Sequence, residues 1–235
     1  MSGANDKMDF PALLASSVHD MKNSLAMLLG SLEEVSQQCV PSGCASENKL
    51  LRIQHEGRRV NRDLIQLLAL YRMDNDRYFL NVDEQNVAEM LDEVALDCEA
   101  LLASHGIRLL LESDDALTGY FDHDLVSGVI NTVIHNAYQY TRDTILLRAS
   151  QHNDYLMISV EDNGPGYPES MLRPEQAPAP GVDFGSGSTG LGLYFASRVA
   201  AMHENRGRRG YTEILNRGLA GDDQAQGGRF AMYLP

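Results

Sequence analysis

Apolar side chains at heptad spacing dominate the first 75 residues. The first run alternates intervals of four and three and consists of Leu14, Val18, Met21, Leu25, Leu28, Leu32 and Val35. This seam extends over about three heptads and predicts a long amphipathic helix with one apolar stripe. A second run continues the alternation and consists of Leu50, Ile53, Gly57, Val60, Leu64, Leu67 and Tyr71. Gly57 interrupts the second run, which indicates a bend or a close helix crossing at that point.

Residues 39–46 separate the two runs. They include Pro41 and Gly43 and are therefore expected to form a loop. Two long helices joined by a short loop predict an antiparallel helical hairpin over residues 1–75. A single hairpin leaves an apolar face uncovered, and two copies related by a twofold axis would close it into a four-helix bundle. We therefore predict a homodimer that forms through the N-terminal helices.

Charge is distributed unevenly along the 235 residues. The net charge is −14, and residues 1–75 carry 8 Lys and Arg against 9 Asp and Glu, whereas residues 76–235 carry 11 against 24. This balance excludes nucleic acid and anionic membrane surfaces as main partners, because both require basic protein surface. The apolar fraction of 43% is sufficient for a packed core.

Several absences in the sequence indicate a soluble protein. No stretch approaches the ~18 apolar residues of a membrane span, and no charged-then-apolar signal segment opens the chain. The three cysteines form no C-x-x-C pair, and an odd number suits a reducing compartment. We expect a cytoplasmic protein that does not interact with membranes. Because only a short tail precedes the first helix, we also expect no built-in sensor domain.

Residues 76–235 mix helical and strand patterns without regular alternation. Helical periodicity covers 87–103, 125–140 and 190–202. Short apolar runs predict strands at 107–111, 145–149, 155–160, 211–215 and 229–234. This mixture predicts an α+β sandwich, with helices on one face of a mixed sheet.

Two glycine-rich turns lie at the ends of predicted elements in this part. Residues 161–166 (Glu-Asp-Asn-Gly-Pro-Gly) follow a strand, where the Asp162 carboxylate could accept a hydrogen bond from the amine of adenine and the glycines allow close approach. Such residues also form ordinary turns. Residues 185–193 open a helix, and the N–H groups of a helix N-terminus can hold phosphate. The long aperiodic segment 167–189 between them is either a lid over a nucleotide or a disordered insertion.

Some polar side chains on the predicted helices could carry chemistry. The amide oxygen of Asn136 suits a Mg²⁺ ion that phosphates already hold, although a helical asparagine is also common without a function. His19 lies on the flank of the heptad seam, beside Asp20 and with Asn23 one turn further on. A neutral imidazole is available as a nucleophile near pH 7, and a neighbouring carboxylate can orient it. Taken alone, such a pair is equally an ordinary helix surface. We expect His135 to serve packing or the surface.

The order and spacing of these motifs resemble the bacterial sensor histidine kinases over roughly residues 12–235. Residues 19–25 (His-Asp-Met-Lys-Asn-Ser-Leu) are similar to the phosphoacceptor box of that family, and Asn136-Ala137 with Tyr140-Thr141 is similar to its N box. Asp162-x-Gly164-x-Gly166 is similar to the first glycine box, and Gly190-Leu191-Gly192-Leu193 to the second. Residues 228–235 resemble the last strand of the family.

The resemblance implies a dimerisation and histidine-phosphotransfer hairpin over residues 1–75, followed by a Bergerat-type ATP-binding domain over residues 76–235 with a lid at 167–189. It implies that His19 accepts the γ-phosphoryl group of ATP, that Asp20 acts as base and orienter, and that Asn23 positions water for dephosphorylation. The implied nucleotide-binding residues are Asn136, Tyr140, Asp162, Gly164, Gly166, Gly190, Leu191 and Gly192, of which Asn136 also ligates Mg²⁺ and Asp162 reads adenine.

The resemblance also implies the partners of the chain. The phosphoryl group would pass to an aspartate on the receiver domain of a response regulator, as part of a two-component phosphorelay. The signal would reach this chain from a separate sensor or another upstream partner protein, because no sensor domain is expected in the chain itself.

Several positions depart from the family pattern. They are Ser24 in place of proline, Thr132 where an asparagine or acid is frequent (with Asn131 one place early), Gln139 in place of a phosphate-contacting lysine, and Phe184 as the nearest candidate for a phenylalanine box. These changes remove charge and polar contacts near the phosphates, so slow autophosphorylation with intact ATP binding is expected. Arg142 is a candidate substitute for the missing lysine.

Two other functions agree with parts of the sequence. In the first, the chain is a histidine phosphotransferase whose His19 shuttles phosphate between receiver domains while the ATP domain is vestigial. The missing lysine favours this alternative, and the intact Asn136, Asp162, Gly164 and Gly166 oppose it. In the second, the chain is a non-catalytic regulator whose helices bind and inhibit another kinase.

Overall fold

The computed structural model describes residues 47–74, 78–172, 191–217 and 227–235, together with helical residues at 18, 21, 23, 25, 27–30 and 32. The chain divides into two compact units, Met1–Tyr78 and Phe79–Pro235. The predicted loop at 39–46 lies outside the described residues. The helical hairpin and its pairing into a four-helix bundle therefore remain predictions.

The first unit contains the long helix α2 (Glu47–Asp74), in the region of the second heptad run. Gly57 on this helix lies against Leu29, because a Cβ atom added at Gly57 would come within 2.6 Å of Leu29 Cδ2. The glycine thus marks a close contact between the two helical segments. Among the first-run residues described, Val18 is buried, whereas Met21 and Leu28 are 57% and 61% exposed.

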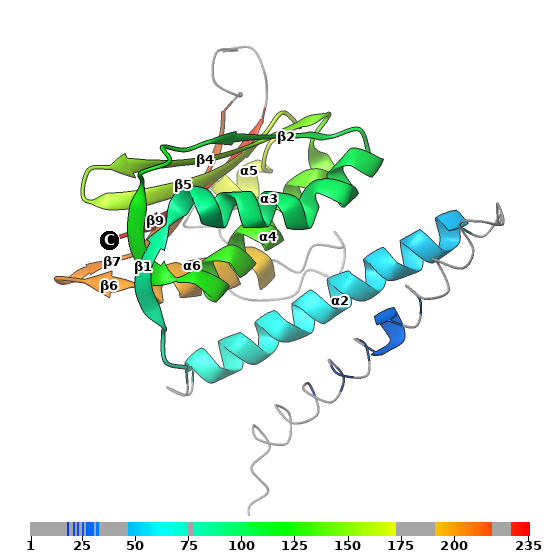
Figure 1. The fold of residues 1–235 in the computed structure, drawn as a ribbon, viewed down its shortest axis with the longest axis horizontal. Coiled ribbons are helices and arrows are strands. Elements are labelled where there is room, and N and C mark those ends of the chain that lie inside the picture. The colour runs from blue at the N-terminus through cyan, green and yellow to red at the C-terminus, as the bar shows by residue number, and fades with distance from the viewer. Residues whose placement is uncertain are drawn as a thin grey trace, which may run out of the picture. The chain divides into compact units, whose positions relative to one another are not determined.

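The second unit is built on a five-stranded sheet in the order β2-β4-β5-β9-β8 (Figure 1). Its strands are β2 (Arg108–Glu112), β4 (Thr144–His152), β5 (Tyr155–Asp162), β8 (Tyr211–Asn216) and β9 (Gly228–Leu234). Strand β2 pairs with β4 in parallel, and the other three pairings are antiparallel. The mixed sheet predicted from the sequence is therefore confirmed.

Three helices cover one face of this sheet: α3 (Val87–Ser104), α4 (His123–Tyr140) and α6 (Leu191–Met202). The strands turn alternate apolar side chains toward these helices, and those that are 2% exposed or less are Ile145, Leu147, Ile158, Val160, Phe230, Met232 and Leu234. Each such side chain contributes about 1.5–3 kcal/mol when it is fully buried. The core therefore lies between the sheet and the helix layer, as the α+β prediction requires.

Asparagine and aspartate caps set where two of these helices begin. The side chain of Asn86 accepts a hydrogen bond from Glu89 N–H at the start of α3, and that of Asp122 accepts from Leu125 N–H at the start of α4. The described chain also contains the short helix α5 (Glu169–Leu172). Such caps satisfy backbone donors that the first turn of a helix leaves free.

Four short strands were not predicted. Strand β1 (Val82–Asn86) pairs with β3 (Thr118–Asp122), and β6 (Glu204–Asn205) pairs with β7 (Arg208–Arg209). All of them are mostly polar, and β1, β6 and β7 contain no buried residue. Because apolar alternation is the main signal of a strand in sequence, these segments give almost none.

A buried histidine connects α6 to the start of α4. His203 is 3% exposed; its Nε2 accepts a hydrogen bond from the backbone N–H of Asp122 at 3.0 Å, and its Nδ1 lies 2.8 Å from the carbonyl oxygen of Val199. Since the carbonyl can only accept, Nδ1 carries the proton and the ring is neutral. Burial accordingly lowers the pKa of His203.

Candidate functional site

The Asp162 carboxylate lies at the end of β5, in the middle of the sheet. The residue is 8% exposed, and its Oδ1 accepts a hydrogen bond from the backbone N–H of Gly164 at 2.7 Å. Burial raises the pKa of Asp162, while hydrogen bonds from the N–H groups of Gly164 and Gly228 oppose this shift. The site therefore presents a desolvated carboxylate that the backbone holds in one orientation.

The positions around this carboxylate require glycine because neighbouring atoms leave no room there for a Cβ atom. A Cβ atom at Gly164 would overlap the carbonyl oxygen of Tyr140, and one at Gly228 would lie 2.8 Å from Asp162 Oδ2. Gly166 has φ +81° and lies against the side chain of Asn216. The first glycine motif thus places the end of β5 directly against the last residue of α4.

The second glycine motif contacts the same helix one turn earlier. A Cβ atom at Gly192, near the start of α6, would lie 2.8 Å from Thr132 Cγ2 and 3.4 Å from Asn136 Nδ2. Helix α4 therefore lies between the two motifs, with Asn136 facing Gly192 and Tyr140 facing Gly164. Asn136 and Tyr140 are both exposed, so their polar atoms are accessible to a ligand.

The positions that depart from the family pattern have their own contacts. Asn131 Oδ1 accepts a hydrogen bond from the buried Cys98 thiol at 3.3 Å, so this amide is engaged between α3 and α4. Thr132 is 7% exposed and donates its hydroxyl to the carbonyl oxygen of Gly128 at 2.8 Å, which leaves its methyl group toward Gly192. Gln139 is exposed, and His135 Nδ1 lies 2.8 Å from the carbonyl oxygen of Asn131.

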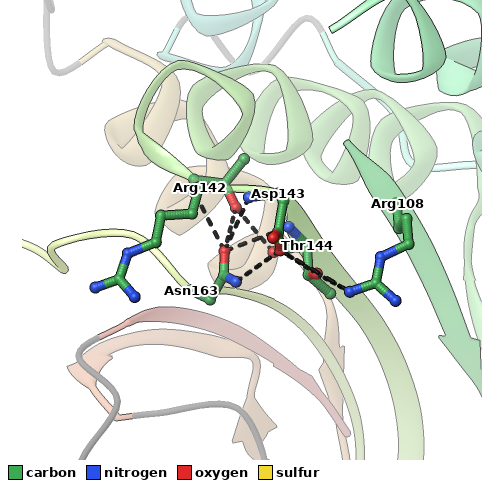
Figure 2. Close-up of polar contacts among 6 residues, drawn as sticks. Arg108, Arg142, Asp143, Thr144 and Asn163 are labelled. Atoms are coloured by element: carbon green, nitrogen blue, oxygen red, sulfur yellow. Dashed lines mark hydrogen bonds and ion pairs between the residues drawn. The ribbon is translucent and has the colours of Figure 1, made fainter. Parts of the chain in front are cut away.

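Two asparagines that the sequence reasoning missed hold the Asp162 turn from both sides. Asn216 on β8 accepts a hydrogen bond from Tyr167 N–H at 2.7 Å and donates one to the Tyr167 carbonyl at 2.8 Å. Asn163 reaches the opposite way, to residues 141–144 that connect α4 to β4 (Figure 2). No local pattern could have revealed either contact, because the partners are 49 and about 20 residues apart.

Tyr167 is a further residue near the carboxylate that the sequence did not indicate. A Cβ atom at Gly228 would lie 3.1 Å from Tyr167 Cε2, so the edge of the tyrosine ring and Asp162 Oδ2 share one side of the site. Burial, with a smaller effect from the Asp162 charge, raises the pKa of Tyr167. The tyrosine therefore stays protonated and adds an apolar surface beside the carboxylate.

Several predicted site residues lie outside the described residues: His19, Asp20 and Gly190, along with residues 173–189 of the predicted lid. Asn23 is described and exposed. In the described part of the chain, no three His, Cys, Asp or Glu side chains gather to hold a metal ion. The Asn136 amide oxygen is of the ligand type that Mg²⁺ takes beside nucleotide phosphates and water.

Residues 121–235 match the model of the family described as histidine kinase-, DNA gyrase B- and HSP90-like ATPases. The matched segment contains α4, both glycine motifs and four of the five strands of the main sheet. The relatives found by sequence include a histidine kinase and a sensor protein, and their matches of 197 and 203 residues extend beyond this domain. The chain is thus similar to histidine kinases and sensor proteins over most of its length, and to this ATPase family over residues 121–235.

Two curated relatives show how much of a sensor kinase this chain spans. Histidine kinase P4 of Formosa agariphila is 24% identical over 197 residues, which are 79% of this chain and 14% of the relative. Sensor protein SrrB of Staphylococcus aureus is 24% identical over 203 residues, which are 84% of this chain and 34% of the relative. The chain thus spans well under half the length of either relative.

A solved structure extends the similarity of the fold. The crystal structure of full-length ShkA in complex with AMPPNP matches with a TM-score of 0.65 at 19% identity, and the match covers 96% of this chain and 46% of ShkA. Over the described residues, no helix of the chain is long and apolar enough to cross a membrane.

Proposed function

We propose that the chain is an ATP-dependent protein histidine kinase that phosphorylates itself on His19. The observation that carries this proposal is the position of α4, which brings Asn136 to Gly192 and Tyr140 to Gly164 beside the buried Asp162. A desolvated carboxylate next to glycine backbone suits a flat, amine-bearing base, and an exposed amide beside a helix start suits phosphates. The related ShkA structure is a complex with AMPPNP, which agrees with this ligand class.

In this proposal each residue of the site has one task. Asp162 accepts a hydrogen bond from the exocyclic amine of adenine, and Gly164 and Gly166 allow the ring to approach the backbone. Tyr140, Gly190, Leu191 and Gly192 are the other nucleotide-binding residues of the proposal. Asn136 directs its amide oxygen to a Mg²⁺ ion, which neutralises charge on the phosphates when it is bound.

His19 is the proposed nucleophile. A neutral ring nitrogen forms a bond to the γ-phosphorus as the bond from that phosphorus to the bridging oxygen breaks, so ADP leaves with the bond electrons. Asp20 orients the ring and accepts its other proton. The phosphoryl group then passes from His19 to an aspartate of a response-regulator receiver domain, and Asn23 positions water if the protein also dephosphorylates that partner.

We further propose that the chain acts as a homodimer and receives its signal from a separate sensor or another upstream protein. The exposed apolar side chains Met21 and Leu28, at 57% and 61%, support a second copy as the cover of this helical face. Because ATP is an intracellular substrate, this function requires a cytoplasmic location. Light scattering at micromolar concentration tests the dimer, and a monomer would contradict it.

The deciding experiment incubates the purified protein with γ-labelled ATP and Mg²⁺, beside the variants His19→Ala and Asn136→Ala. We expect acid-labile, alkali-stable label on the wild type and none on either variant. An unlabelled wild type that acquires label at His19 from a phosphorylated receiver domain would instead establish the phosphotransferase alternative. A cellular activity that survives His19→Ala would favour the non-catalytic regulator.

A further inference from the structure

The side-chain oxygen of Asn163 accepts an unusual number of hydrogen bonds. The donors are the Thr141 hydroxyl at 2.9 Å and three successive backbone N–H groups, at 3.1 Å from Arg142 and at 3.3 Å each from Asp143 and Thr144. Consecutive N–H groups that converge in this way form a concave site for an oxygen with partial negative charge. The amide oxygen of Asn163 occupies this site, so the connection between α4 and β4 is folded around it.

The other end of the same amide is also fixed. Asn163 Nδ2 donates to Asp143 Oδ1 at 2.9 Å, and that oxygen accepts a second hydrogen bond from the Thr144 hydroxyl at 2.6 Å. The hydrogen bond from Thr144, and then the one from Asn163, lower the pKa of Asp143, and the charges of Arg108 and Arg142 add to the effect. An ionised Asp143 requires a donor from position 163, and the converging N–H groups require an acceptor from it. Asparagine supplies both the donor and the acceptor, whereas an aspartate at position 163 would place its carboxylate against that of Asp143.

Figure 2 shows how these groups are arranged. Asn163 points at the connection between α4 and β4, Arg108 approaches Asp143 and Thr144 from the neighbouring strand β2, and the guanidinium group of Arg142 extends away from the cluster. Arg142 therefore contributes its backbone N–H to the cluster and leaves its cationic side chain outside it.

In the sequence, both parts of this cluster lie next to residues that the proposed function assigns to nucleotide binding. Asn163 lies between Asp162 and Gly164 in the chain, and residues 141–144 follow directly after Tyr140. Gly164 contacts the Tyr140 carbonyl, and Asp162 accepts from Gly164 N–H. A shift of residues 141–144 away from Asn163 would therefore move Tyr140 relative to Gly164 and Asp162.

We propose that Asn163 is a positioning residue for nucleotide binding, which holds the Asp162 turn against the end of α4 through its hydrogen bonds to residues 141–144. This inference rests on the proposed function, because it assigns a role in placing the adenine-binding carboxylate. Asn163 itself does not contact the nucleotide; it acts through Asp162 and Tyr140.

The test compares four proteins: the wild type, Asn163→Asp, Asp143→Asn and the double variant that carries both changes. Their affinity for Mg²⁺–AMPPNP is measured by titration calorimetry, at a temperature at which circular dichroism shows every protein folded. Asn205→Asp, in the exposed hairpin of β6 and β7, is the control that adds the same charge elsewhere.

We expect Asn163→Asp to bind the nucleotide about tenfold more weakly, because it opposes the Asp143 carboxylate. The double variant exchanges amide and carboxylate across the same contact, so its affinity is expected to return to within about threefold of the wild type. Asp143→Asn keeps an amide oxygen that can accept from Asn163 Nδ2, so it is expected to weaken binding by no more than about threefold. Asn205→Asp is expected to bind as the wild type does.

Several outcomes would overturn this inference. A folded Asn163→Asp variant with a lower melting temperature but wild-type affinity would show that the cluster serves stability alone. A double variant that binds the nucleotide as weakly as Asn163→Asp would show that the contact with Asp143 does not account for the loss of affinity. If Asn163→Asp does not fold, Thr141→Val removes one hydroxyl donor and keeps the side-chain shape. It is expected to weaken binding about threefold, and unchanged affinity would contradict the proposal. A wild type that binds no nucleotide would refute the proposed function itself.

Discussion

The two glycine motifs of the second unit are held by different kinds of contact. Directional hydrogen bonds fix the Asp162 turn: the N–H groups of Gly164 and Gly228 donate to Asp162. The side-chain oxygens of Asn163 and Asn216 accept from backbone N–H groups. At the start of α6, by contrast, Gly192 packs on the methyl group of Thr132. Hydrogen bonds fix an orientation, whereas packing tolerates small shifts. Under the proposed function, the comparison therefore predicts a precise site for the base at Asp162 and an adjustable one for the phosphates at Gly192.

The largest effect is expected at the base. Asp162→Asn keeps the shape of the side chain but removes the charge that accepts from adenine, so AMPPNP should bind about a hundredfold more weakly, as for the loss of a hydrogen bond to a charged group. Calorimetric titration measures this. Asp154→Asn, in the turn between β4 and β5, is the matched control and should bind normally. If Asp162→Asn and Asp154→Asn bind AMPPNP with similar affinity, the adenine base does not bind at Asp162.

A pair of alanine substitutions compares the two motifs directly. Gly164→Ala forces a methyl group onto a backbone carbonyl and should lower the free energy of unfolding by about 3 kcal/mol. The methyl group of Gly192→Ala meets side chains alone, Thr132 Cγ2 most closely and Asn136 Nδ2 at 3.4 Å, and should cost about 1 kcal/mol. Urea denaturation gives both values. Adding Thr132→Ser to Gly192→Ala removes the Thr132 methyl group and should restore stability. Equal losses at the two glycines, or no rescue, would refute the distinction.

A substitution near the proposed phosphate site is expected to change the rate of autophosphorylation without changing the affinity for the nucleotide. Gln139→Lys adds a cation on the exposed side of α4 and should raise the initial rate of His19 labelling about tenfold, because phosphoryl transfer depends on charge stabilisation. The affinity for AMPPNP should stay within about twofold. Gln151→Lys, which adds the same charge on β4, is the control. A labelling rate that does not differ between the two variants would exclude position 139 from the phosphate contacts.

The smallest expected effect is a pH dependence at the far end of α6. Burial lowers the pKa of His203 below 6.5, although the nearby Asp122 charge and the hydrogen bond to Val199 act against this shift. The unfolded chain therefore takes up a proton that the folded chain cannot, and stability that is complete above about pH 6.5 declines as the pH falls below it. Melting temperatures from pH 7.5 to 5.5 should show a shallower decline for His203→Gln than for the wild type or the exposed His105→Gln. Parallel curves for all three would contradict this role.

The sequence predicted the elements whose apolar pattern is strong and missed those without one. The strands at 145–149 and 155–160 are present because they are short, nearly continuous apolar runs that the fold buries. The helices at 87–103 and 125–140 are present because their apolar side chains repeat at the helical period. Strands β1 and β3 pair through polar residues such as Glu84 and Gln85, so their sequences show little of the apolar pattern that marks a strand. The glycines at 164 and 192 were recognisable as motifs, but Asn163, Asn216 and Tyr167 were not, since their partners are distant in the chain.

Asn136 and Tyr140 are separated by four residues on α4, which is about 6 Å of helix rise. One of them faces the start of α6 and the other faces the end of β5. This interval sets the spacing between the two glycine motifs, which the proposed function assigns to the two ends of the nucleotide. Residue types within it can change, but inserting or deleting one residue would rotate one contact by about 100° against the other. Helix α4 therefore keeps the two glycine motifs at one spacing, whichever residues occupy the turn between them.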